Sequence, residues 1–233
     1  MTPVLEVSGL VAGYGRTAVV HDLDLVVQRG EVVALLGPNG AGKTTTLLTV
    51  AGLLEPIAGS VAFGEGSGER RPHRLARAGV ALVPDDRGLF DSLTVREHLQ
   101  LGVPRRDRSA AVDRAVELFP VLEPITDRRV GLLSGGEQQM VALAVALDRS
   151  PSLLMIDELS LGLAPLVVRS LIPAIRTAAA ATNCGVLLVE QHAHVALDLA
   201  SRAYVMTRGR VCLEAPTSDL RADPTLLEQA YLG

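Results

Sequence analysis

A glycine-rich segment at residues 37–44 constrains the fold of this chain more than any other feature. It reads Gly-Pro-Asn-Gly-Ala-Gly-Lys-Thr and satisfies the pattern G-x-x-x-x-G-K-[ST]. The apolar run at residues 31–36 predicts a buried parallel strand before it, and an apolar stripe over residues 46–54 predicts a helix after it. Because strand, glycine-rich turn and helix are the setting in which this pattern holds phosphate, we predict a P-loop.

Each part of the P-loop has a predicted role in holding a polyphosphate. The glycines let the backbone turn closely around an anion, and the amides at the start of the helix point towards it. Lys43, the only lysine in the chain, would reach the terminal phosphates, and the Thr44 hydroxyl would ligate Mg²⁺. The predicted phosphate-binding residues are Gly37, Asn39, Gly40, Ala41, Gly42, Lys43, Thr44 and Thr45.

Composition limits the class of protein further. A chain of 233 residues, 48% of them hydrophobic, suits one large domain or one domain with an inserted lobe. The net charge of −4 argues against a nucleic-acid binder, which usually carries a basic excess. The N-terminus does not resemble a secretory signal, and no apolar run reaches the roughly 18 residues of a membrane span. We therefore expect any membrane role to depend on a partner.

The order of predicted elements places α/β segments on both sides of a helical one. Strands are predicted at residues 4–7, 23–27, 31–36, 59–64, 79–84, 152–158, 185–189, 203–206 and 210–213. Residues 11–15 are predicted as a loop, residues 64–74 as a polar connection, and residues 75–78 as a short helix. Helices are predicted at residues 94–99, 110–119, 134–147, 167–181 and 225–232. We predict an ATP-binding core of residues 1–84 and 150–233, with residues 85–149 as an inserted helical subdomain.

Two adjacent carboxylates end the predicted strand at residues 152–158. The carboxyl end of a parallel strand lies at the sheet edge where ligands bind, so Asp157 and Glu158 would lie beside the P-loop. Asp157 would hold Mg²⁺ directly or through water, and Glu158 would polarise the water that attacks the γ-phosphate. Taken alone, the pair is equally typical of two solvated charges at a strand end.

Two further segments have the chemistry of a nucleotide site. Ser134, Gly135 and Gly136 open a predicted helix, where two glycines expose amides and the serine adds a hydroxyl donor. A serine N-cap with a flexible hinge is the simpler interpretation. Tyr14, which lies between two glycines, is either a surface turn residue or a platform on which a base stacks.

The segment Leu-Ser-Gly-Gly-Glu-Gln-Gln at residues 133–139, with the P-loop and the strand end Ile-Asp-Glu, resembles the nucleotide-binding subunit of ATP-binding cassette (ABC) transporters. The resemblance covers essentially the whole chain. It implies a P-loop NTPase with a RecA-like, mostly parallel sheet, an antiparallel β portion and an inserted helical subdomain. It also implies ATP and Mg²⁺ as ligands, and two ATPase domains paired head to tail. Ser134, Gly135 and Gly136 would then complete the ATP site of the partner.

Three smaller segments resemble a subfamily of these ATPases. Residues 83–90, 160–165 and 189–192 are similar to the smaller, LivF-type ATPase of branched-chain amino acid importers. The resemblance implies an ATPase at the cytoplasmic face of the membrane, bound to two permease subunits and paired with a second ATPase. It also implies a solute-binding protein that delivers the cargo, and no nucleic acid.

At four positions the chain departs from the pattern of this family. Asp85 stands where most members have a glutamine that contacts Mg²⁺ and the attacking water, and where the LivF type has glutamate. Gln191 stands where most members have a γ-phosphate-contacting histidine, as it tends to in the LivF type, and His192 lies one residue later. Leu159 replaces a proline, and Val145 replaces an arginine.

These departures leave open a slow ATPase, or a regulatory cassette that binds ATP without turnover beside an active partner. A P-loop kinase is a further alternative, although residues 133–139 would have no role in one.

Overall fold

Two β-sheets organise the protein in the computed structural model, which describes residues 3–64 and 70–232. The smaller sheet is antiparallel, with strand order β2-β1-β4. The larger sheet has the order β5-β6-β7-β3-β8-β9, and its pairs are parallel except for the antiparallel pair β8–β9. The predicted α/β class, with a mostly parallel sheet and an antiparallel portion, is confirmed.

The strands are β1 (Leu5–Tyr14), β2 (Thr17–Val27), β3 (Val32–Leu36), β4 (Ala58–Ala62), β5 (Val80–Val83), β6 (Leu153–Asp157), β7 (Gly185–Glu190), β8 (Arg202–Thr207) and β9 (Arg210–Pro216). The α-helices are α1 (Lys43–Val50), α2 (Pro72–Arg77), α3 (Val95–Leu99), α4 (Arg108–Leu118), α5 (Gly135–Asp148), α6 (Pro165–Thr182), α7 (Ala193–Leu199), α8 (Thr217–Ala222) and α9 (Thr225–Leu232). Short 3-10 helices lie at Arg105–Asp107, Pro120–Ile125 and Val130–Leu132. Among the described residues, no helix combines the length and the apolar character needed to cross a bilayer.

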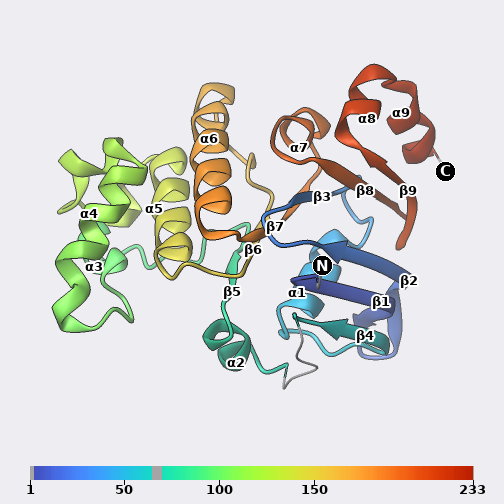
Figure 1. Ribbon diagram of the computed structural model, residues 1–233, viewed down its shortest axis with the longest axis horizontal. Helices are drawn as coiled ribbons and strands as arrows, with labels where there is room; N and C mark the ends of the chain where they lie inside the picture. Colours follow the sequence, from blue (N-terminus) through green and yellow to red (C-terminus); the bar gives the residue numbers. More distant parts are fainter. Residues whose placement is uncertain (1–2, 65–69, 233) are drawn as a thin grey trace.

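The central strands β3, β6 and β7 are buried along their whole length, as their apolar sequences predict. Their side chains alternate between two cores. On one face Leu35 and Met155 pack with residues of the antiparallel sheet and α1. On the other face Leu36 and Ile156 pack with residues of the helices. Figure 1 shows the sheets and helices in this arrangement.

Helices α3, α4 and α5 contact one another at one end of the molecule (Figure 1). Thr94 and Ser134 are the N-caps of α3 and α5, and each forms a capping box with the glutamate three residues on. The apolar residues of these helices belong to the same core as the helix-covered face of the sheet. The division into a core and an inserted subdomain at residues 85–149 stays a prediction.

The predicted loop at residues 11–15 is wrong, because β1 continues to Tyr14 and β2 begins at Thr17. Gly13 pairs with Ala18, and a Cβ on Gly13 would overlap the Thr17 carbonyl oxygen. A glycine that indicates a loop in sequence therefore allows the close approach of two strands.

Two helices have other bounds in the structure than the sequence predicts. The first helix ends at Val50, and Gly52 with φ 71° follows it, so Leu54 does not continue its apolar stripe. The helix predicted at residues 75–78 begins earlier, with Pro72 in its first turn. The polar connection predicted at residues 64–74 therefore ends before Pro72, and its residues 65–69 lie outside the described residues.

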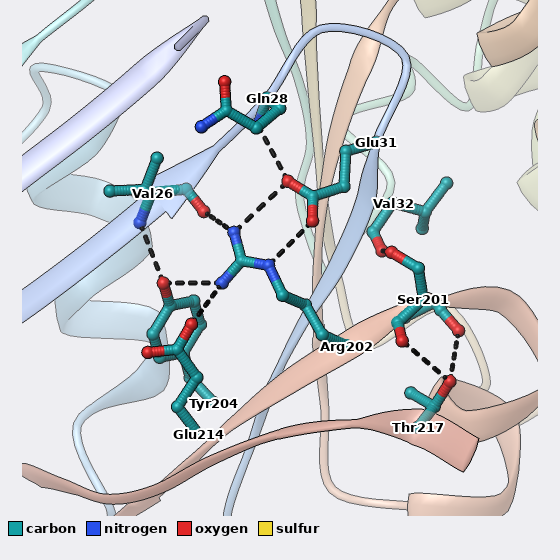
Figure 2. A network of polar contacts seen from close by, with 10 residues as sticks. Val26, Gln28, Glu31, Val32, Ser201, Arg202, Tyr204, Glu214 and Thr217 are labelled. Atoms are coloured by element: carbon teal, nitrogen blue, oxygen red, sulfur yellow. Dashed lines mark hydrogen bonds and ion pairs between the residues drawn. The ribbon is translucent and has the colours of Figure 1, made fainter. Parts of the chain in front are cut away.

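One arginine joins the two sheets (Figure 2). It pairs with β3 near the start of that strand, whereas the P-loop follows the end of β3. Arg202, on β8, donates to Glu31 Oε1 at 2.7 Å, to the Tyr204 hydroxyl at 2.6 Å and to Glu214 Oε1 at 2.7 Å. It also donates to the carbonyl oxygen of Val26, at the end of β2. Burial alone would lower the pKa of Arg202, but its hydrogen bonds to Glu31 and Tyr204 raise that pKa overall.

Replacing Arg202 with Met is expected to lower the free energy of unfolding by about 2 kcal/mol, because it leaves the Glu31 carboxylate, 18% exposed, without its cation. Urea unfolding measures the change. Arg210→Met on β9 is the matched control, since this exposed arginine should change stability by no more than about 0.5 kcal/mol. Equal stabilities of the two variants would contradict the role of Arg202.

Candidate functional site

The glycine-rich segment connects β3 to α1, as predicted. Gly42 caps α1 with φ 105°, a left-handed conformation that favours glycine. Lys43 is 4% exposed, and its Nζ donates to the carbonyl oxygens of Gly37 at 2.9 Å and Pro38 at 3.2 Å. These bonds draw the lysine back over its own loop, so a bound phosphate would have to compete with two carbonyl oxygens for the ammonium group.

The β8–β9 turn supports the P-loop. Gly209 N donates to the Ala41 carbonyl oxygen at 2.9 Å, and the Gly209 carbonyl oxygen accepts from His21 N at 2.8 Å. Gly209 has φ 79°, and a Cβ there would overlap the Val19 carbonyl oxygen. The turn therefore fixes the P-loop relative to β2. The sequence predicts a hairpin at Arg208 and Gly209, but it does not predict the contact between Gly209 and Ala41 of the P-loop.

Four carboxylates follow neighbouring strands at the same sheet edge. Asp85 lies just after β5, Asp157 and Glu158 lie at the end of β6, and Glu190 ends β7, which adjoins β3 and its P-loop. Lys43 is close enough to Asp157, Glu158 and Glu190 for their charges to affect its pKa. Burial lowers the pKa of Lys43, and the three carboxylates oppose this effect. The edge thus brings one cation and several anions together, as strand order predicts.

Asp157 is the most perturbed carboxylate of this group. It is 3% exposed, and its Oδ1 has no hydrogen-bond partner. Burial is the main cause that raises the pKa of Asp157 to about 6, and the charges of Asp85 and Glu158 add to it. A hydrogen bond with the Thr44 side chain and the charge of Lys43 act in the opposite direction. A buried, unpaired carboxylate oxygen beside a threonine hydroxyl is a donor set that fits a hard cation such as Mg²⁺.

Glu158 adopts an unusual backbone conformation. Its φ is 49°, in the left-handed region that residues with a Cβ rarely occupy, and its N–H donates to the Val189 carbonyl oxygen at 2.9 Å. Such strain clusters at functional sites. Glu190, which ends β7, is 0% exposed and is not among the residues predicted for the site.

The predicted second anion site lies away from the P-loop. Ser134 is exposed at the start of α5, and its Oγ donates to Glu137 Oε2 at 2.7 Å. Gly136 lies against Val167 of α6. Arg87 binds the start of α5 from the turn after β5, through Gln138 Oε1 at 3.1 Å and Gln139 Oε1 at 3.2 Å. Figure 1 shows α5 and α1 well apart along the long axis of the molecule, so one copy of the chain does not bring the two helix starts together.

The remaining candidate residues lie at the ends of strands β1, β7 and β5. Tyr14 is 56% exposed at the end of β1, in the hairpin that adjoins the P-loop through β2. Gln191 follows β7 and is half-buried. His192 is the N-cap of α7, and its Nδ1 lies 3.4 Å from Ser160 Oγ. Asp85 is exposed, and its Oδ1 accepts from Asp86 N at 2.9 Å.

The profile of the family described as "ABC transporter" matches residues 20–160, which is more than half of the chain. The chain is the ATP-binding subunit of an ABC transporter. This ABC ATPase is 39% identical over 224 residues to the high-affinity branched-chain amino acid transport ATP-binding protein BraG of Pseudomonas aeruginosa, covering 94% of the chain and 95% of BraG. It is 33% identical to a probable branched-chain amino acid transport ATP-binding protein LivF of Archaeoglobus fulgidus, covering 93% of the chain and 94% of LivF.

A relative with a different function is almost as similar to the ABC ATPase as the LivF protein is. The lipopolysaccharide export system ATP-binding protein LptB of Escherichia coli is 32% identical, covering 98% of the chain and 97% of LptB. A solved structure described as an ATP-binding subunit of an ABC transporter has a TM-score of 0.83 and 30% identity, covering 98% of each chain. Family membership makes the protein an ATPase and one subunit of a transporter complex. It does not settle the cargo.

Proposed function

We propose that this ABC ATPase hydrolyses Mg·ATP to drive uptake of branched-chain amino acids or a related small polar solute. The observation that carries the proposal is the meeting of Lys43, Asp157 and Glu158 at one sheet edge, in a chain 39% identical to BraG along almost its whole length. In the proposed complex the protein lies at the cytoplasmic face of the membrane. Its partners are two permease subunits, a second ATPase, and a solute-binding protein that acts indirectly.

ATP would bind with its phosphates in the P-loop and its base on Tyr14. Amides at the start of α1 and the Lys43 ammonium would replace the hydration of the phosphates, which requires Lys43 to leave the carbonyl oxygens of Gly37 and Pro38. The exposed ring of Tyr14 offers a flat apolar surface for stacking.

Thr44, Asp157 and Asp85 are the residues that would hold Mg²⁺. The unpaired Asp157 Oδ1 and the neighbouring Thr44 hydroxyl fit this role, and the exposed Asp85 would reach the ion through water. When bound, Mg²⁺ would neutralise charge on the transferring phosphoryl group. Glu158 would accept a proton from the attacking water, and Gln191 would help to orient that water.

A second ATPase would complete each ATP site. Ser134, Gly135 and Gly136 form the start of α5, where Ser134 is exposed, Gly135 is half-buried and Gly136 is buried. This helix start lies far from the P-loop of the same chain (Figure 1). In a head-to-tail pair this helix start would face the γ-phosphate of the partner, where its amides favour an anion.

The loop after β5 offers a surface for a permease. A cavity of about 430 Å³ opens between this loop and α5, lined in part by Leu82, Phe90, Leu101 and Val145. Phe90 is 62% exposed and stacks on His98 with ring centroids 5.8 Å apart. An apolar groove with an exposed aromatic ring is typical of a protein contact. Because Asp85 lies in the same loop, a change at the ATP site would reach the permease over a short path.

Solute uptake tests the proposal. Cells that lack this subunit, complemented with the wild type or with Lys43→Ala, are assayed for uptake of labelled leucine. We expect the wild type to restore uptake and Lys43→Ala to restore none. If deletion leaves leucine uptake unchanged, the assignment of the solute fails. A defect in lipopolysaccharide export in the same cells would favour a function like that of LptB.

A further inference from the structure

The conformation of Glu158 has to be held by its surroundings. With φ 49°, its backbone is costly for a residue with a Cβ, and such conformations persist only where neighbouring contacts fix them. The bond from Glu158 N to the Val189 carbonyl oxygen fixes one side of the residue at 2.9 Å. The other side belongs to a tight turn, in which Leu161 N donates to the Glu158 carbonyl oxygen at 3.0 Å.

The turn after Glu158 is fixed to β7 by the buried carboxylate of Glu190. Oε1 of Glu190 accepts from Ser160 N at 2.9 Å, and Oε2 accepts from Ser160 Oγ at 3.0 Å. Oε2 also lies 3.3 Å from His192 N, which donates to it. One side chain therefore binds the segment that follows Glu158 and the segment that follows β7.

The burial of Glu190 indicates that its carboxylate has a structural role. Glu190 is 0% exposed, so it cannot contact ATP without rearrangement, and burying a carboxylate is costly. Its two oxygens accept from three donors, Ser160 N, Ser160 Oγ and His192 N, so the buried side chain is fully used as a link between the two segments. The charge of Lys43 lies close enough to compensate part of the cost.

The buried side chain of Leu159 adds a further restraint on the backbone of this turn. It is 0% exposed and packs in the helix-side core, so the residue between Glu158 and Ser160 cannot move outward without exposing apolar surface. Backbone bond, carboxylate and core together leave the Glu158 backbone little freedom.

We propose that Glu190 is a positioning residue that fixes Glu158 through Ser160. The proposal rests on the proposed function in taking Glu158 as the residue that accepts the proton. Glu190 acts on the place of the Glu158 carboxylate and not on ATP itself. Its loss should therefore slow hydrolysis much more than it weakens ATP binding, because a misplacement of about 1 Å can cost roughly 100-fold in rate.

Kinetics of variants at Glu190 and Ser160 test the proposal in the full chain, with its partner subunits where these are needed for turnover. We expect Glu190→Ala to lower kcat about 10- to 100-fold with KM for ATP within about threefold. Glu190→Gln should stay within about fivefold of the wild type, because its amide keeps the bond to Ser160 N, can donate to Ser160 Oγ, and gives up only the longer contact with His192 N at 3.3 Å. The double variant Ser160→Ala/Glu190→Ala should be no slower than Glu190→Ala alone, since both act through one contact.

Hydrogen exchange supplies a readout that does not depend on turnover. The amides of residues 158–161 should exchange faster in Glu190→Ala than in the wild type. Their exchange rates should be unchanged in Glu158→Gln. If Glu158→Gln hydrolyses ATP normally, the proposed role of Glu158 fails, and the exchange result still tests the positioning.

Three results would overturn the role of Glu190. They are a kcat of Glu190→Ala within twofold of the wild type, an equal loss of kcat in Glu190→Gln, and unchanged exchange at residues 158–161. Should Glu190→Ala not fold, Ser160→Ala replaces it. This smaller change is expected to lower kcat about threefold or more at unchanged Tm, and an unchanged kcat would refute the proposal.

Discussion

Replacing Glu158 with Gln is expected to lower the kcat of ATP hydrolysis at least roughly 100-fold, the contribution that a positioned general base makes. The amide has the size of the carboxylate but cannot accept the proton of the attacking water. ATP affinity should change little, because Lys43 and the P-loop amides are untouched. Phosphate release measures kcat, and equilibrium binding of ATP measures affinity.

The same variant is expected to trap the ATP-bound pair of ATPase domains. In the proposed head-to-tail pair, two ATP molecules that are not hydrolysed would keep Ser134 and Gly136 of each copy engaged with the other. Light scattering with and without Mg·ATP would detect the dimer, which the wild type should populate only briefly. Glu228→Gln, the same chemical change at an exposed residue of α9, is the control and should behave as the wild type. Full turnover by Glu158→Gln would reject the assignment of this residue.

Two physical rules predicted which side chains meet at the sheet edge beside the P-loop. Fully apolar runs indicate strands buried on both faces, and the carboxyl ends of parallel strands meet at one edge. These rules place Asp157 and Glu158 near Lys43 although 114 residues separate Lys43 from Asp157. The capping box at Thr94 was predictable because it needs only two residues three positions apart.

The features that the sequence did not reveal depend on contacts between distant segments. Glu190 is identifiable only once its bonds to Ser160, 30 residues earlier, are known. Gly209 looks like any hairpin glycine until its N–H is found on Ala41 of the P-loop. At Gly13 the local preference for a loop was overridden by pairing with β2, which no pattern within residues 11–15 indicates. The strands and the sheet edge at which they end can be predicted from the sequence. The side chains and turns that hold neighbouring segments together at that edge cannot.

Replacing Asp157 with Asn is expected to make the nucleotide-free protein more stable. Burial raises the pKa of Asp157 from its ordinary value of 3.8 to about 6. At pH 7 the folded state therefore carries a carboxylate whose ionisation costs about 3 kcal/mol relative to the unfolded chain, at 1.36 kcal/mol for each pKa unit. Asparagine removes that charge at constant size, so the free energy of unfolding should rise by about 2–3 kcal/mol.

The stability difference between Asp157→Asn and the wild type should depend on pH. Between pH 3.8 and about 6 the folded state holds a proton on Asp157 that the unfolded chain has lost, so stability from this group falls as pH rises through that window. The gap between Asp157→Asn and the wild type should be largest at pH 7 and should nearly vanish at pH 4. Urea unfolding at both values, without nucleotide, measures it. Asp113→Asn, at an exposed position of α4, is the control; a variant less stable than the wild type, or a gap independent of pH, would contradict the prediction.

Mg·ATP should reverse the order of the two proteins. A ligand that binds only the folded state at 1,000 times its Kd adds about 4.1 kcal/mol of stability, which exceeds the advantage of about 2–3 kcal/mol expected for Asp157→Asn without ligand. The wild type would gain this amount, because its buried carboxylate finds a cation, whereas Asp157→Asn would gain little and hydrolyse ATP slowly. A residue that costs stability without ligand and contributes most with it serves binding rather than folding. If both proteins gain equally from Mg·ATP, Asp157 is not a ligand of the metal.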